Sequence, residues 1–120
     1  AWLYYEDQQE EARRRAPHFV DERIPRFLQY FERVLVHNGG DVLAGESLSH
    51  ADLGLFQALE GLAYAFPRGF ARASESTPGV VALRERVRER PRVAAYLASE
   101  RRVPFNQEGI FRRYPELDAD

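Results

Sequence analysis

The apolar residues in the first third of the chain recur at intervals of three and four, and this spacing constrains the fold more than any other feature. The series after Phe19 comprises Val20, Ile24, Phe27, Leu28, Phe31, Val34 and Leu35. On an α-helix these residues form one wide stripe that is stable only when other elements bury it. Asn38-Gly39-Gly40 follows, and glycine readily ends a helix because it adopts the left-handed conformation without strain. The pattern predicts a long helix that ends near Asn38.

Two prolines interrupt this helical pattern. Pro25 lies within it, where it removes a backbone donor and crowds the preceding turn, so we expect a bend there. Pro17 is expected to separate a shorter leading helix, about Asp7 to Ala16, from the long helix.

A second helix is predicted from near His50 to about Ala65. Its inner face is expected to carry Leu53, Phe56, Leu59, Leu62 and Ala63. Pro67 and Gly69 predict a break after it. The loop expected next has the turn-forming residues Ser74, Ser76 and Thr77. Val42-Leu43-Ala44 is the one strand candidate, and it is too short to count as a strand.

Two further helices are predicted downstream. Pro78 suits the first turn of a third helix, because its missing donor would be unpaired there in any case. That helix is lined by Val80, Leu83 and Val87. Pro91 ends it and can begin a short fourth helix, beyond which the tail is irregular and aromatic. The fold class is therefore all-α, a small bundle of about four or five helices in one domain over residues 1–120.

The stretch SLSHADLGLF, residues 47–56, has the pattern of a helix start. As N-cap, Ser49 can accept from the backbone donor of Asp52, and the Asp52 carboxylate can accept from the donor of Ser49, which together form a capping box. Leu48 and Leu53 hold the positions of a hydrophobic staple. The carboxylate also lies where the helix dipole favours negative charge.

The same stretch could be interpreted as a Ser-His-Asp catalytic triad. A triad needs an imidazole that bridges hydroxyl and carboxylate side chains brought together by the fold. Consecutive residues in a first helical turn instead point in different directions. We therefore assign Ser49 and Asp52 a folding role and predict no catalytic residue in this chain.

The composition argues against several functional classes. The net charge is −2 and all 17 basic residues are arginines interleaved with carboxylates, so a one-sided basic surface for nucleic acid is not expected. No apolar run reaches the ~20 residues of a membrane span, and no secretory leader opens the stretch. The chain has no cysteine, which is compatible with the expected cytoplasmic location. Its aromatic opening over residues 1–5, without a helix cap, predicts a fragment of a longer protein.

No metal site is predicted from the histidines. His18, His37 and His50 lie far apart in the sequence, and no pair has the four-residue spacing that places two imidazoles on one helical face. Asn38-Gly39-Gly40-Asp41 does not follow a strand or carry the lysine of a phosphate loop, so we interpret it as a helix stop and turn.

Two charged runs are interpreted as ion-paired helix faces. Glu10 with Arg14, and Glu11 with Arg15, have the spacing and order of stabilising helical pairs. In the second run, Arg84 to Arg92, glutamates dilute the positive charge. A role for this second run in contacting a partner domain stays open.

Three segments resemble, in this order, the C-terminal helical domain of the glutathione transferases. RIPRFLQYFERVLVHNGG resembles the long bent helix of that domain, and LAGESLSHADLGLF resembles its loop and the capped core helix that follows. TPGVVALRERVRERPRVAAYLAS resembles the two later helices, which an Arg-Pro junction separates. The resemblance covers about Asp7 to Ser99. The tail PFNQEGIFRRYPELD looks like that of bacterial members close to the sigma-type branch.

The resemblance implies a helical domain that works beside a thioredoxin-like domain. In that family the thioredoxin-like domain binds glutathione and supplies the Tyr, Ser or Cys that activates the thiol. The helical domain supplies part of a hydrophobic electrophile pocket and part of a dimer interface. The resemblance thus implies a detoxifying, homodimeric parent enzyme with glutathione as co-substrate, an apolar electrophile and no tightly bound cofactor. The present chain, which has no thioredoxin-like pattern, is expected to be inactive alone.

The aromatic tail supplies the candidates for the electrophile pocket. They are Phe105, Ile110, Phe111 and Tyr114. A tail after the last helix can fold over a cleft and exclude water, but it can also simply pack back onto the bundle. Packing is the favoured interpretation for Phe105, and both interpretations stay open for Phe111 and Tyr114.

Two questions remain open at this level. Tyr4 and Tyr5 are further pocket candidates, although a tyrosine pair at this point of a chain is more often core or domain interface. The parent protein could also be a non-enzymatic interaction module, because helical domains of this kind also occur in proteins that only mediate assembly.

Overall fold

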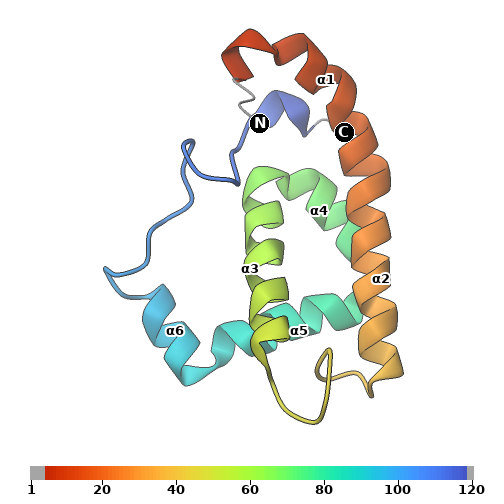
Figure 1. The fold of residues 1–120 in the computed structure, drawn as a ribbon, viewed down its shortest axis with the longest axis vertical. Helices are drawn as coiled ribbons and strands as arrows, with labels where there is room; N and C mark the ends of the chain where they lie inside the picture. Colours follow the sequence, from red (N-terminus) through yellow and green to blue (C-terminus); the bar gives the residue numbers. More distant parts are fainter. Residues whose placement is uncertain (1–4, 119–120) are drawn as a thin grey trace.

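A computed structural model describes residues 5–118 of this chain, and this part is helical without any β-strand (Figure 1). Its α-helices are α1 (Gln9–His18), α2 (Ile24–His37), α3 (His50–Ala65), α4 (Pro67–Ser74), α5 (Pro78–Glu89) and α6 (Pro91–Leu97). Short 3₁₀ turns, η1 (Tyr5–Asp7) and η3 (Pro115–Leu117), stand at the two ends. The predicted all-α class is confirmed. No helix of the described part is long and apolar enough to cross a membrane.

Pro17 does not separate two helices, so that prediction is wrong. Pro17 lies inside α1, and a π-helical turn, η2 (Phe19–Arg23), joins α1 directly to α2. The backbone N–H of Ile24 donates to the carbonyl of Phe19, five residues back, and this wider turn comes directly before Pro25. Pro25 follows in the first turn of α2. Because it has no N–H, it cannot donate to a carbonyl of the preceding turn. The helix axis changes direction between α1 and α2 (Figure 1).

The core lies where α2, α3, α4 and α5 pack together. Its most deeply buried apolar residues are Ile24, Leu28, Leu35, Leu59, Val80, Leu83 and Val87, which confirms the predicted stripe of α5 and most of that of the long helix. The prediction for Phe27 is wrong, because this side chain is 49% exposed. The prediction for Leu53 is wrong, because this side chain is 41% exposed. Asp52 takes the inward position in the first turn of α3, and the next residue is rotated by about 100° around the helix. Leu55, which was not predicted, lies on the inner face, and the predicted residues Phe56 and Leu59 are buried there as well.

The start of α3 contains the predicted capping box. The Asp52 carboxylate accepts from the backbone N–H of Ser49 at 2.9 Å, and the Ser49 hydroxyl accepts from the N–H of Ala51 at 3.3 Å. The other Asp52 oxygen accepts from the N–H of Leu43 at 2.9 Å, which ties the preceding loop to the helix. Asp52 is fully buried. The staple between Leu48 and Leu53 stays a prediction.

A helix, α4, occupies the segment for which the sequence predicts a loop, so that prediction is also wrong. Pro67 begins α4, and the Asp118 carboxylate accepts from the backbone N–H groups of Arg68 and Gly69, both at 2.8 Å. The cap thus comes from a residue about 50 positions away, so no local sequence pattern predicts it. Gly69 permits this packing, because a Cβ there would lie 2.4 Å from Cγ1 of Val20.

The first turn of α5 is held in the same way. Pro78 begins the helix, and the two carboxylate oxygens of Glu32 on α2 accept from the N–H groups of Gly79 at 2.9 Å and Val80 at 2.8 Å. Because these amides have no partner within their own helix, a carboxylate there satisfies their hydrogen bonding and complements the helix dipole. Glu32 therefore joins α2 to α5.

Replacement of Asp52 by alanine should lower the free energy of unfolding by about 2–3 kcal/mol, since the part-buried backbone donors of Leu43 and Ser49 lose their acceptor. Glu46→Ala removes an exposed carboxylate from the preceding loop and should change it by less than about 0.5 kcal/mol. Urea unfolding followed by circular dichroism measures both. Equal stability of the two variants would contradict the role assigned to Asp52.

Candidate functional site

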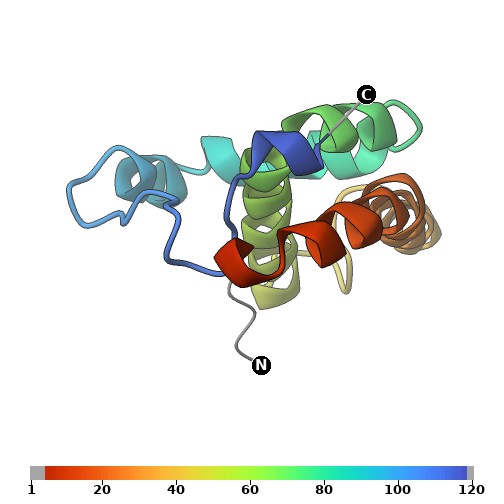
Figure 2. The same cartoon turned by 90° about the horizontal axis from the view of Figure 1, so that it is seen from above.

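A cavity of about 480 Å³ lies between α1 and the end of the chain. Its walls are mainly apolar and include Ala12, Ala16, Phe19, Phe66, Tyr114 and Leu117. Seen from above, α1 and the C-terminal turn η3 stand at the same end of the bundle (Figure 2), and the two elements are in contact. We call this space the α1 cavity.

Two tyrosines close one side of the α1 cavity. The rings of Tyr5 and Tyr114 stack at 3.7 Å between centroids with an angle of 11° between their planes. The Tyr5 hydroxyl donates to the Glu116 carboxylate. This bond raises the pKa of the Tyr5 phenol, with smaller contributions from desolvation and from the Glu116 charge. Acceptance of the bond lowers the pKa of Glu116. The contacts join the chain's first described turn to its last.

Of the four predicted pocket residues, Tyr114 lines the α1 cavity. Phe105 stacks on Tyr64 of α3 with centroids 5.2 Å apart, and Phe111 meets the Phe105 ring edge-on at 5.9 Å. Phe105 and Phe111 thus pack onto the bundle. Ile110 is 94% exposed and does not line the cavity. It follows the turn at Asn106, whose side-chain oxygen accepts from the N–H groups of residues 108 and 109.

Gly61 provides the seat for Phe111. A Cβ at Gly61 would lie 2.4 Å from three ring atoms of Phe111, so only glycine allows this ring to sit against α3. No local pattern predicted this contact, because the two residues are 50 positions apart and a glycine within a helix has several possible causes. The packing of Phe111 therefore fixes where the C-terminal segment, residues 100–118, crosses the bundle.

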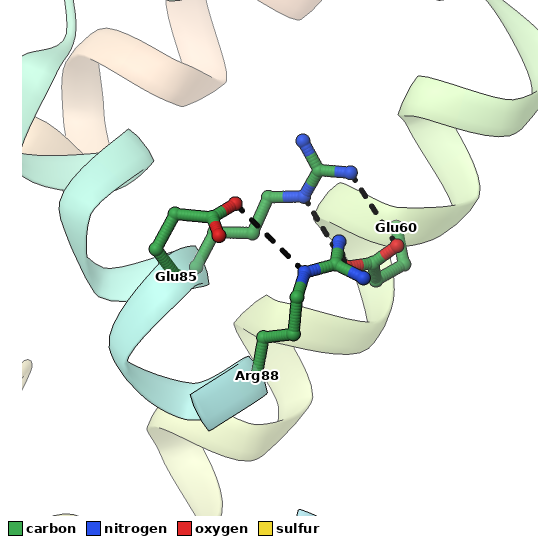
Figure 3. Close-up of polar contacts among 4 residues, drawn as sticks. Glu60, Glu85 and Arg88 are labelled. Atoms are coloured by element: carbon green, nitrogen blue, oxygen red, sulfur yellow. Dashed lines mark hydrogen bonds and ion pairs between the residues drawn. The ribbon is translucent and has the colours of Figure 1, made fainter. Parts of the chain in front are cut away.

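Figure 3 shows a polar cluster away from the α1 cavity, in which Glu60 of α3 contacts arginines of α5. Arg84 donates to both oxygens of Glu60 at 3.3 and 3.4 Å, and Arg88 also donates to Glu60. Arg88 lies 3.8 Å from Glu85 as well. Glu60 is buried, so the interpretation of this run as a solvated helix face is wrong for Arg84. The cluster instead links α3 to α5.

The two arginines also cover aromatic rings of the core. The guanidinium carbon of Arg84 lies 5.2 Å from the centroid of Phe70, and that of Arg88 lies 5.9 Å from the centroid of Phe56. These distances are typical of cation–π contacts. Nearer the start of the chain, the predicted pair of Glu10 and Arg14 is present.

The stretch around Ser49 does not form a catalytic triad. The Ser49 hydroxyl and the Asp52 carboxylate bond backbone amides of the helix start, and His50 beside them is exposed. Tyr4, the other tyrosine considered from the sequence, lies outside the described residues. Within residues 5–118, no three His, Asp or Glu side chains are grouped to hold a metal ion.

The fold and the capped α3 define a helical domain of the glutathione transferase type. Residues 1–100 match the family described as "Glutathione S-transferase, C-terminal domain", and the chain belongs to this family. It is 33% identical over 95 residues to glutathione S-transferase alpha I of Oryctolagus cuniculus. That match covers 77% of this chain and 41% of the rabbit protein, so the chain spans about two fifths of its relative. Placement in a bacterial sigma-type branch stays a prediction.

Gly61→Ala should destabilise the domain by about 1–3 kcal/mol, because the added methyl group displaces Phe111. Gly54 lies on the same helix, and a Cβ added there would meet no neighbouring atom within 4 Å. Gly54→Ala should therefore stabilise the domain by about 0.5–1 kcal/mol, because alanine has the higher helix propensity. Thermal unfolding of both variants measures the difference. If Gly61→Ala stabilised the domain, the proposed close packing of Phe111 on Gly61 would be wrong.

Proposed function

We propose that this chain is the helical domain of a glutathione transferase and that the α1 cavity forms part of the pocket for the electrophile. The observation that carries the proposal is an apolar cavity of about 480 Å³ in a chain of this family. Small-molecule sites have volumes of roughly 300–1,000 Å³ and mainly apolar walls with a few polar groups. The cytoplasmic location and the role in detoxification belong to this proposal.

In this proposal the domain binds and orients the electrophile but does not activate the thiol. Formation of a thiolate near neutral pH requires a positioned donor or dipole beside the sulfur. The Tyr5 hydroxyl at the cavity donates instead to Glu116. We therefore assign glutathione binding and thiol activation to a companion thioredoxin-like domain. The helical domain contributes apolar walls that exclude water from the reacting groups.

A second apolar surface is proposed to contact that companion domain. A groove of about 290 Å³ runs between α3 and α6. Its lining includes Leu53, Phe56, Val93, Tyr96 and Leu97. Leu53 and Tyr96 are 41% and 44% exposed, and clustered exposed apolar residues are typical of interaction surfaces. The rabbit relative has more than half of its length outside the match, which leaves room for such a domain. Homodimerisation of the parent protein is part of the same proposal.

Tyr114→Ala in the full-length protein should raise the Michaelis constant for an apolar electrophile by about fivefold, because a wall of the cavity is lost. The Michaelis constant for glutathione should change by less than twofold. Steady-state kinetics with each substrate varied in turn measures both constants.

Ile110→Ala is the matched control, since it removes an apolar side chain from the same segment outside the cavity. It should leave both constants unchanged. Equal effects of Tyr114→Ala on the two substrates would remove the cavity from the electrophile site. A folded full-length protein with no glutathione-dependent turnover would instead favour the non-enzymatic assembly module.

A further inference from the structure

The turn that follows α2 contains the dipeptide Asn38-Gly39, whose groups can react with each other. An asparagine amide is most reactive when glycine follows it, because glycine has no side chain to hinder attack by its backbone nitrogen. In the reaction, the nitrogen of Gly39 bonds to Cγ of Asn38, the Cγ–N bond of the amide breaks, and ammonia leaves with the Gly39 proton. Water then opens the cyclic imide, and the residue becomes aspartate or isoaspartate. One water is consumed for each ammonia released.

In the folded domain, hydrogen bonds hold both reacting groups in other directions. The backbone N–H of Gly39 donates to the carbonyl of Val36 at 3.2 Å. The side-chain nitrogen of Asn38 donates to the carbonyls of Val42 and Gly45, both at 3.0 Å. Ring closure turns the Gly39 nitrogen toward Cγ and removes the amide nitrogen, so it breaks all three bonds. The reaction therefore requires the loop that joins α2 to α3 (Figure 1) to open first.

Arg86 of α5 holds the same loop closed from another helix. Its Nη2 donates to the carbonyl of Asp41 at 2.7 Å and to that of Gly40 at 3.4 Å. These two residues come directly after the reactive pair. Because hydrogen bonds from a charged donor are stronger than neutral ones, Arg86 raises the free energy that is needed to open the loop.

Conversion of Asn38 removes the donors that close the loop. The amide nitrogen donates to two carbonyls, whereas a carboxylate at the same place can only accept. Two carbonyl oxygens would then face a negative charge, so the closed loop is no longer favourable. Leu43 of this loop donates to Asp52 at 2.9 Å, and release of the loop therefore also weakens the cap of α3.

From these contacts we propose that Asn38 is a modification site: it deamidates spontaneously when the loop of residues 38–49 opens, and the product keeps the loop open. The reaction needs no enzyme and no co-reactant besides water. Arg86 slows it by holding the loop closed. The modification is irreversible, so it limits the lifetime of the folded domain.

Peptide mass spectrometry of the full-length protein, incubated at mildly alkaline pH, measures the conversion of each asparagine. In protein unfolded by urea, Asn38 should convert faster than Asn106, because the side chain of Gln107 hinders attack there. In the folded protein, conversion of Asn38 should be at least about tenfold slower than in urea. Arg86→Ala should accelerate conversion in the folded protein about three- to tenfold. Arg90→Ala, which removes an exposed arginine from the same charged run, should leave the rate unchanged.

Asn38→Asp reproduces one product of the reaction and should lower the melting temperature of the full-length protein by about 2–5 °C. Asn106→Asp is the matched control. The side-chain oxygen of Asn106 accepts from the N–H groups of residues 108 and 109 at 2.8 and 3.0 Å, and a carboxylate keeps both bonds. It loses only the exposed bond to the carbonyl of Pro104 at 3.3 Å, so the melting temperature should change by less than about 1 °C.

Three results would overturn the proposal. The first is an Asn38 that reacts no faster than Asn106 in urea, or equally fast in folded and unfolded protein. The second is a folded Arg86→Ala variant that reacts at the rate of the unmodified sequence. The third is equal melting temperatures for Asn38→Asp and Asn106→Asp, because the product would then leave the loop closed. If Arg86→Ala does not fold, the comparison of folded with unfolded protein decides.

Discussion

Carboxylates at the first turns of three helices hold this domain together. Asp52 caps α3 from within, whereas Glu32 reaches from α2 to α5 and Asp118 reaches from the end of the chain to α4. Each accepts hydrogen bonds from amides that a helix cannot satisfy internally. Because two of these caps come from other elements, the starts of α4 and α5 depend on tertiary packing.

The same interactions position the α1 cavity. Asp118 fixes the end of the C-terminal segment beside α4, and Leu117 and Tyr114, a few residues before it, form a wall opposite α1. Gly61 seats Phe111 and so determines the path of the segment across α3. The cavity therefore depends on contacts that hold the C-terminal segment against α3 and α4.

Interactions between residues near in sequence could be predicted, and those between distant residues could not. Ser49 and Asp52 are three positions apart, so their capping box and the helix it begins are apparent from the letters alone. The cap of α4 is Asp118, which lies about 50 positions after the amides that it accepts from. Without knowledge of this cap, Pro67 and Gly69 have the pattern of a helix break. Among the pocket candidates, Tyr114 could be named from its aromatic character, but only the turn before Ile110 determines that this side chain faces solvent.

Hydrogen exchange of backbone amides tests most directly whether the distant carboxylates hold the helix starts. In Glu32→Ala, the amides of Gly79 and Val80 should lose protection, while those of Arg68 and Gly69 keep theirs. Asp118→Ala should give the reverse pattern. Unchanged protection of Gly79 and Val80 in a folded Glu32→Ala variant would contradict the account, and so would a uniform loss at both helix starts.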